Sequence, residues 1–391
     1  MISRWLYASI LSLLIAACGG GSSDSDLQAD SGAGARPPVS DTPSDGAPSP
    51  SPSPSPSPSP SPDPENPQPP SGTDEGDNNG DDDAGNDNGG NEVPAPGPLA
   101  DLRFENPYEI ATDANGNLYV VDGENNRARM RRIAPNGSVT TLLPESDQTI
   151  TALAVTPGGE IFYSAASDPY SGQGYIWRIE NGVPVQLTSE AMAIAEFVID
   201  PSNGNLYVGI WTPDGPEVKE VRQDGEVTTL FSIDETHGAP EVMTLRDDVL
   251  WLVWRDGPYR TREFRWSRTN GLEEILIDLD YVTGMEASDA GIYVAGYRGS
   301  SANLSIASSC TVKLLDPVTL ELSHLAGVEG EPCHYQEDTP PPGRIDLRHT
   351  SLTQAADGNL YLTENFRDVL RRITPAGEVT TYAGVHNQPG F

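Results

Sequence analysis

A short motif returns along the chain at a nearly constant interval. Gly-Asn-Leu-Tyr occurs at residues 116–119, 204–207 and 358–361, and weaker copies with a central aromatic residue lie between them. Alignment on that aromatic residue gives six equivalent positions: Tyr119, Phe162, Tyr207, Trp251, Tyr293 and Tyr361. Four of the five steps are close to 44 residues, an interval typical of one four-stranded blade of a β-propeller. The fifth step corresponds to one blade plus an insertion of about 24 residues.

Each repeat contains four segments rich in β-forming residues, separated by turn residues. In the first repeat these segments are 108–112, 117–121, 130–133 and 139–142, and Asn-Gly pairs precede the second and the fourth. No amphipathic helical pattern of useful length follows residue 98. The sequence therefore predicts an all-β domain over residues 99–391, a six-bladed β-propeller of four-stranded antiparallel blades.

The first and last repeats resemble the NHL repeat. The resemblance rests on a glycine turn, an acidic residue with Asn and Arg after the second strand, a basic third strand and a closing Val-Thr-Thr strand. In the first repeat the matching residues are Pro107, Gly116, Asp122, Asn125, Asn126, Arg127, Arg131, Arg132, Ile133, Gly137 and Val139 to Thr141. In the last repeat they are Gly358, Asn365, Arg371, Arg372, Ile373, Gly377 and Val379 to Thr381, with Glu364 near the usual place of Asp. The resemblance implies a propeller but leaves function open, because this family includes scaffolds, sensors and enzymes.

The two ends of the repeat region are predicted to meet in space. Residues 382–391 resemble the start of a connection between blades, and residues 99–106 resemble the end of one. Such an arrangement would close a ring.

The amino terminus has the pattern of an export signal. Arg4 is followed by an apolar run over residues 5–17, which is shorter than the roughly 20 residues of a membrane span. The run ends in Ile15-Ala16-Ala17-Cys18, which resembles the lipobox of bacterial lipoproteins. Residues 1–17 are therefore expected to be a lipoprotein signal peptide, and Cys18 to carry the lipid that anchors the chain. Gly19 favours an outer-membrane lipoprotein, on either the periplasmic or the cell-surface face.

Residues 18–98 are expected to form a disordered linker. From residue 19 onward this segment contains no Phe, Trp, Tyr, Ile or Met, so it cannot bury enough apolar surface to offset the entropy of ordering. Ser-Pro pairs over residues 49–62 favour a stiff polyproline II spacer. Carboxylates at positions 81, 83, 87 and 92 partly match a calcium loop, but Asn86 stands where that loop needs glycine. A solvated acidic linker is the favoured interpretation.

The charge of the chain argues against one class of partner. Its formal net charge is −35, and Lys219 and Lys313 are its only lysines. Binding to phosphate backbones needs a basic face, so no nucleic-acid partner is expected.

One face of the predicted ring is the expected ligand face. It is formed by the connections from fourth to first strands and from second to third strands, which gather seven loops: 103–109, 122–129, 164–174, 209–217, 255–263, 297–303 and 364–368. The candidate ligand residues in these loops are Glu124, Asn126, Tyr170, Trp211, Arg255, Tyr259, Arg298, Glu364, Asn365 and Arg367. Aromatic, Arg and carboxylate side chains together suit a carbohydrate, peptide or protein ligand, so the chain is predicted to be a membrane-anchored binding module.

A metal-dependent lactonase, hydrolase or lyase on the same scaffold is the alternative. Glu109, Glu196 and Glu241 stand at the starts of first strands, where they would point toward the axis and could hold a divalent cation such as calcium. Five histidines, His237, His324, His334, His349 and His386, are spaced unlike a zinc site, and there is no Gly-x-Ser-x-Gly elbow. No catalytic residue is predicted, no cofactor is required, and the metal ligands stay open.

Two of the three cysteines are predicted to form a disulfide. Cys310 lies in the expected third strand of the fifth blade, and Cys333 lies in the insertion that follows it. An exported protein meets an oxidising compartment. Closing the loop between these cysteines would stabilise the fold by about 3 kcal/mol.

Overall fold

A computed structural model describes residues 99, 101–124, 127–166, 173–232, 240–255, 260–298, 308–330, 343–347 and 350–390. The predicted signal peptide, Cys18 and the linker lie outside these residues. The described part contains no helix that is long and apolar enough to cross a membrane.

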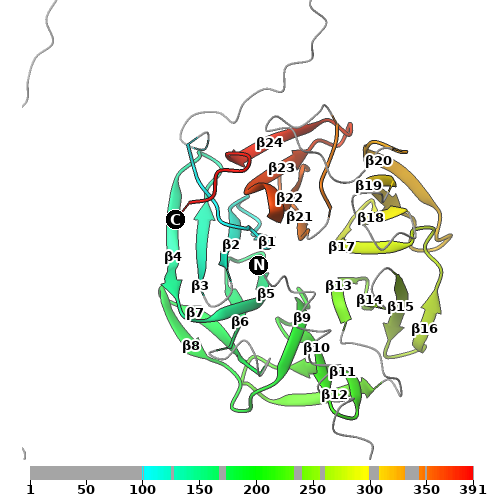
Figure 1. The fold of residues 1–391 in the computed structure, drawn as a ribbon. Helices are drawn as coiled ribbons and strands as arrows, with labels where there is room; N and C mark the ends of the chain where they lie inside the picture. Colours follow the sequence, from blue (N-terminus) through cyan, green and yellow to red (C-terminus); the bar gives the residue numbers. More distant parts are fainter. Residues whose placement is uncertain are drawn as a thin grey trace, which may run out of the picture. The chain divides into compact units, whose positions relative to one another are not determined.

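Six four-stranded antiparallel sheets are arranged as the blades of a ring (Figure 1), which confirms the predicted fold. Blade 1 contains β1 to β4 (Glu109–Thr112, Leu118–Glu124, Arg127–Ile133, Val139–Ser146). Blade 2 contains β5 to β8 (Thr149–Val155, Ile161–Ala166, Tyr175–Glu180, Val183–Gln186). Blade 3 contains β9 to β12 (Ala193–Ile199, Leu206–Thr212, Gly215–Val221, Val227–Ser232).

The second half of the ring is built in the same way. Blade 4 contains β13 to β16 (Pro240–Arg246, Val249–Arg255, Thr261–Ser267, Gly271–Ile275). Blade 5 contains β17 to β20 (Tyr281–Ser288, Gly291–Arg298, Ser308–Leu315, Leu322–Gly327). Blade 6 contains β21 to β24 (Leu352–Gln354, Leu360–Glu364, Val369–Ile373, Val379–Gly384), with the 3₁₀ turn η2 (Asn365–Arg367) after β22. The predicted insertion falls between β20 and β21, so it connects blades 5 and 6.

The core lies between the blades rather than at the centre of the molecule. Among the described residues, buried apolar side chains form six clusters, and each cluster joins two neighbouring blades. The six aromatic residues of the repeat all lie on second strands and are all buried. A second strand has a neighbouring blade on each of its two faces, so nearly every side chain along it is covered.

The Gly-Asn-Leu-Tyr motif forms the hairpin between first and second strands. In blade 1, Asp113 accepts bonds from the backbone N–H groups of Asn115 and Asn117 and, at 3.0 Å, from the Tyr119 hydroxyl. Gly116 has a φ of +76°, which favours glycine. Burial, together with the bond to Asp113, raises the pKa of Tyr119 to about 12. The motif therefore repeats because it forms the hairpin between the first and second strands.

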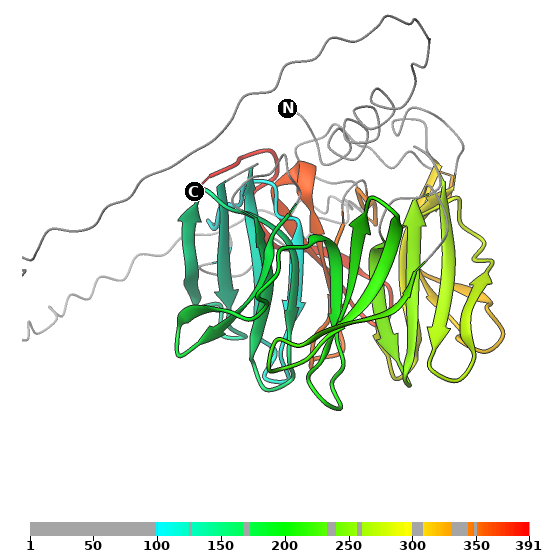
Figure 2. The ribbon, with the colours of Figure 1, turned by 90° about the horizontal axis from the view of Figure 1, so that it is seen from below.

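The two ends of the propeller lie together, as the sequence predicts. Among the described strands, each blade consists of four that are consecutive in sequence, and none is exchanged between the first and last blades. The backbone N–H of Gly390 donates to the carbonyl of Phe104 at 3.0 Å, and Arg129 donates to the Gly390 carbonyl at 3.2 Å. We call residues 385–390 the C-terminal strap. Figure 2 shows this segment in red at one end of the blades.

Two connections predicted as loops are largely strand. Residues 122–124 and 127–129 continue the pairing of β2 with β3, in which Asp122 pairs with Arg129 and Glu124 with Arg127. Residues 209–217 similarly extend the β10–β11 hairpin as far as the Thr212 to Gly215 pair. In the first case, opposite charges face each other across the strands, which favours continued pairing over an open loop.

Candidate functional site

The described candidate residues lie where second strands end, on the predicted ligand face. Trp211, Arg255, Arg298 and Glu364 lie at or near the ends of β10, β14, β18 and β22, and Asn365 and Arg367 form η2. Asn126, Tyr170, Tyr259 and Cys333 lie outside the described residues, and only the backbone of Glu124 is described. The predictions on these residues are untested, and so is the pairing of Cys333 with Cys310.

One group of candidates joins blades 4 and 5. Arg255 donates to Glu241 at 2.5 Å and to the Tyr281 hydroxyl at 3.1 Å. The Tyr281 ring stacks on Tyr297, with ring centroids 5.1 Å apart. Burial opposes the charge on Arg255, but Glu241 and Tyr281 together outweigh it and raise the pKa of the guanidinium. Arg298 is engaged separately, by the carboxylate and carbonyl of Asp278. The bond from Arg255 to the Tyr281 hydroxyl therefore joins blade 4 to blade 5, whereas the Glu241 contact and the Tyr281–Tyr297 stack each lie within one blade.

A buried ionic group lies at the same end of blade 1. Asp122 is fully buried and accepts from Arg129 at 2.6 Å, from Arg131 at 2.9 Å and from the backbone N–H of Glu105 at 3.1 Å. Arg131 also donates to the Arg103 carbonyl at 2.8 Å. Burial lowers the pKa of Arg131 despite the neighbouring Asp122. Asp122 therefore fixes the segment that enters β1.

Blade 6 repeats this arrangement with different residues. Glu364 stands three residues after Tyr361, as Asp122 stands three after Tyr119, and it accepts from the backbone N–H of Asp346 at 3.0 Å. Its carboxylate is 4.0 Å from Arg371, and both side chains are buried. In each blade the incoming segment has the order arginine, apolar residue, acid, at residues 103–105 and 344–346. The acid after the second strand thus holds the entering segment in both blades.

A strained corner forms where blade 6 meets blade 1. Three non-glycine residues there adopt left-handed backbone angles: Asn106 at +49°, Asp368 at +60° and Asn387 at +55°. The backbone N–H of Asn106 donates to the Asp368 carboxylate at 3.0 Å, and that of Asn387 donates to the Arg367 carbonyl at 3.1 Å. Burial raises the pKa of Asp368. We call this group, with Asn365 and Phe366, the blade 6–1 corner.

Arg367 is the buried support of this corner. Its side chain donates to the Asn387 carboxamide at 3.2 Å and approaches the Asp346 carboxylate at 3.5 Å. Asn365 donates to the Asn106 carbonyl at 3.1 Å, which ties η2 to the segment before blade 1. The sequence identified Asn365 and Arg367 but not Asn106, Asp368 or Asn387. Asparagine and aspartate tolerate left-handed angles, and the predicted meeting of the two ends was the signal that could have found them.

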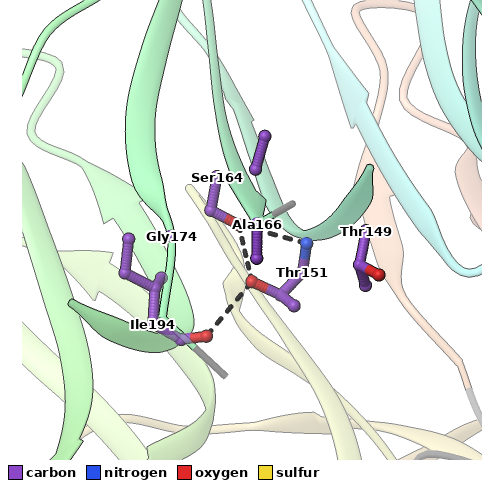
Figure 3. Close-up of a pocket in the computed structure, with 7 residues that line it drawn as sticks. Thr149, Thr151, Ser164, Ala166, Gly174 and Ile194 are labelled. Carbon is purple, nitrogen blue, oxygen red and sulfur yellow. Dashed lines mark hydrogen bonds between the residues drawn. The ribbon is translucent and has the colours of Figure 1, made fainter. Parts of the chain in front are cut away.

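A small hollow lies between blades 2 and 3 (Figure 3). The Thr151 hydroxyl lies 2.6 Å from that of Ser164 and donates to the Ile194 carbonyl at 3.1 Å. The hollow has a volume of about 40 Å³, room for no more than a few water molecules. Its lining consists of Thr149, Thr151, Ser164, Ala165, Ala166, Gly174 and Ile194.

The residues considered for a metal site are described only in part, because His237, His334 and His349 lie outside the described residues. Glu109, Glu196 and Glu241 begin or lie within the first strands β1, β9 and β13, and Glu241 is bound to Arg255. His324 lies on β20, and His386 is 3.1 Å from the Thr381 hydroxyl. Within the described ranges, no three His, Cys, Asp or Glu residues form a group that could hold a metal ion.

Comparisons with known proteins identify no family for this chain. No protein-family model and no curated protein sequence matches the chain. Among solved structures, a streptogramin B lyase is 15% identical with a TM-score of 0.48, over 74% of this chain and 86% of its own. TolB from Acinetobacter baumannii is 15% identical with a TM-score of 0.47, over 73% of this chain and 67% of its own. The tricorn protease is 13% identical with a TM-score of 0.49, over 74% of this chain and 27% of its own.

Proposed function

We propose that this chain is a lipid-anchored binding protein whose propeller binds a carbohydrate, peptide or protein ligand at the blade 6–1 corner. The lipobox at Ile15 to Cys18 supports the anchor, and the linker over residues 18–98 would hold the propeller away from the membrane. The repeats of blades 1 and 6 support an NHL-type propeller.

One observation supports this position of the binding site. Three left-handed non-glycine residues converge at one point of the ligand face, and each such residue costs about 1 to 3 kcal/mol of strain. Strained backbone of this kind concentrates at binding sites, where the surrounding structure holds it in place. Here Arg367 and Asp368, both buried, provide the holding bonds to Asn387 and Asn106. The corner is thus built before any ligand arrives, which reduces the entropy cost of binding.

The proposal is tested by binding of the detergent-solubilised full chain to immobilised oligosaccharides and to a displayed peptide library. We expect a specific ligand in one of these sets, with binding weakened by Asn365→Ala. The matched control is Trp211→Ala, which alters a side chain on the same face but in blade 3. A ligand whose binding is lost in Trp211→Ala and retained in Asn365→Ala would contradict the assignment of the site.

A further inference from the structure

Side chains on or beside the first strands bond to the backbone of the neighbouring blade. Ser351 accepts from the Ile110 N–H at 3.3 Å, which joins blade 6 to blade 1. Thr244 accepts from the Ala287 N–H at 3.0 Å, which joins blade 4 to blade 5. Blades 5 and 6 are joined in the same way, but by a group that can gain or lose a proton, the carboxyl of Glu286.

The Glu286 carboxyl bonds to two consecutive residues of blade 6. Its Oε1 accepts from the Gln354 backbone N–H at 3.0 Å and from the Thr353 hydroxyl at 3.2 Å. Two residues earlier, Gly284 lies so close to blade 6 that a Cβ atom there would be 2.6 Å from the Leu352 side chain. The two blades therefore approach closely at this point, and the carboxyl lies between them.

The strands of blades 5 and 6 that contact Glu286 bring no positive charge to it. On β18, Tyr293 stands opposite Glu286, and its hydroxyl accepts from the Gln354 carboxamide at 3.5 Å. The strand β21 has no charged residue. The only other titratable residue of β17 is Tyr281, at the start of the strand, and its hydroxyl accepts from Arg255.

The first strand of blade 4, β13, has two charged residues, and both are held by other groups. Glu241 binds Arg255 at 2.5 Å, and Arg246 donates to two backbone carbonyls at the β17–β18 hairpin. Glu286 therefore has only neutral donors among the described residues, and burial raises its pKa to about 7. A neutral carboxyl suits this position, whereas a carboxylate would be a charge without a counter-charge between two blades.

We propose that the contact between blades 5 and 6 is pH-sensitive: it is closed while Glu286 is protonated and loosens when Glu286 ionises. The ordinary pKa of this carboxyl is 4.5, so its contribution to the closed contact is complete below pH 4.5 and is lost as the pH rises through 7. If opening returns Glu286 to water, the equilibrium constant for opening rises about 70-fold between pH 5 and pH 8.

Opening of this contact would also loosen a support of the blade 6–1 corner. Ile345 and Leu347 are buried in the apolar cluster that blades 5 and 6 share. Asp346, between them, lies 3.5 Å from Arg367. The inference itself concerns the contact between the blades and holds whether or not the corner binds a ligand.

Hydrogen–deuterium exchange of the full chain, resolved to single amides between pH 5 and pH 8, tests this inference. After correction for the intrinsic pH dependence of exchange, protection of the Gln354 amide reports closure of the contact. We expect this protection to fall about 70-fold in the parent protein and to change little in Glu286→Gln, which keeps a neutral acceptor. The matched control is Glu263→Gln, which removes a buried carboxyl of blade 4 whose pKa is also about 7. This control should keep the response at Gln354.

A second amide distinguishes local opening from unfolding of the whole propeller. The Ile110 N–H is bonded to the Ser351 hydroxyl, which does not titrate in this range, so its protection should stay constant. A response confined to Gln354 and removed by Glu286→Gln supports the inference. No response in the parent protein, or the same response in Glu286→Gln, overturns it. Equal losses at Ile110 and Gln354, which the parent protein alone can show, also overturn it, as does a response that Glu263→Gln removes.

Discussion

The buried carboxylate of Asp122 gives the sharpest test of how blade 1 holds the segment that enters it. It receives bonds from two arginines and one backbone N–H, and its side chain is fully buried. The variant Asp122→Asn keeps the shape of the side chain but leaves Arg129 and Arg131 without their shared negative charge. Removing one partner of a buried ion pair costs about 3 to 5 kcal/mol, because the remaining charge stays out of water. We expect a loss of free energy of unfolding in this range.

Blade 1 also provides a matched control. Arg127 and Glu145 form an ion pair between β3 and β4 with the same 2.6 Å separation as Arg129 and Asp122. The two pairs differ in burial: the side chains of Arg127 and Glu145 are 49% and 41% exposed, whereas those of Arg129 and Asp122 are 10% and 0% exposed. Solvent screens an exposed pair, so Glu145→Gln should leave the free energy of unfolding nearly unchanged.

Urea unfolding followed by tryptophan fluorescence measures both variants. The slope of free energy against urea should be the same in the three proteins, so that a change in midpoint reports stability. A loss below about 1 kcal/mol for Asp122→Asn, or equal losses in the two variants, would refute the argument that burial decides the strength of these ion pairs.

Three further predictions concern other parts of the chain. Burial raises the pKa of Glu263 to about 7 from an ordinary value of 4.5. The contribution of Glu263 to the free energy of unfolding is therefore greatest below pH 4.5 and falls as the pH rises toward 7. Glu263→Gln should therefore reduce the difference in unfolding free energy between pH 5 and pH 8 by about 2.5 kcal/mol, and an unchanged difference would contradict this. Cys18→Ser should release the protein from membranes on fractionation, and continued partition into detergent would exclude lipid anchoring at this residue. Peptide mapping without reductant should recover Cys310 and Cys333 in one linked species; free alkylation of both would show that they are not paired.

The fold could be predicted from the sequence because a propeller imposes the same environment at every repeat. The second strand of each blade lies between two neighbours, so an aromatic residue returns there even where the rest of the repeat has diverged. Blade 4 has Asp247 and Asp248 in place of a glycine turn, yet both adopt left-handed angles and the hairpin forms. Turn residues other than glycine can therefore form the same hairpin, so the interval between repeats is unchanged.

The site was less accessible to prediction, because the surroundings of a charged residue depend on segments far apart in sequence. Asp122 was assigned to a loop, whereas it is buried by arginines from β3 and by the segment before β1. The opposite charges of Asp122 and Arg129 across one hairpin could have predicted the longer strands. Nothing local to Phe104 indicates that the C-terminal strap would lie beside it, since the bond from the Gly390 backbone N–H to the Phe104 carbonyl joins the two ends of the propeller.

The residue type at the position of Asp122 differs from blade to blade. The difference depends on whether the chain connects a blade directly to its neighbour. Trp254 occupies the equivalent place in blade 4 and packs edge-on against Phe264, at a centroid distance of 4.7 Å, where blade 1 has Asp122 and Arg131. Blade 4 is joined to its neighbours by the chain itself, so apolar packing suffices to fix which blades meet. Blades 6 and 1 have no chain between them, and their contact must be selected by non-covalent bonds alone. Ion pairs and hydrogen bonds require specific partners in specific directions, whereas apolar contacts accept many. We infer that blade 1 keeps the acid and arginine of the repeat because the ring closes there: Arg129, which binds Asp122, also donates to the Gly390 carbonyl of the C-terminal strap.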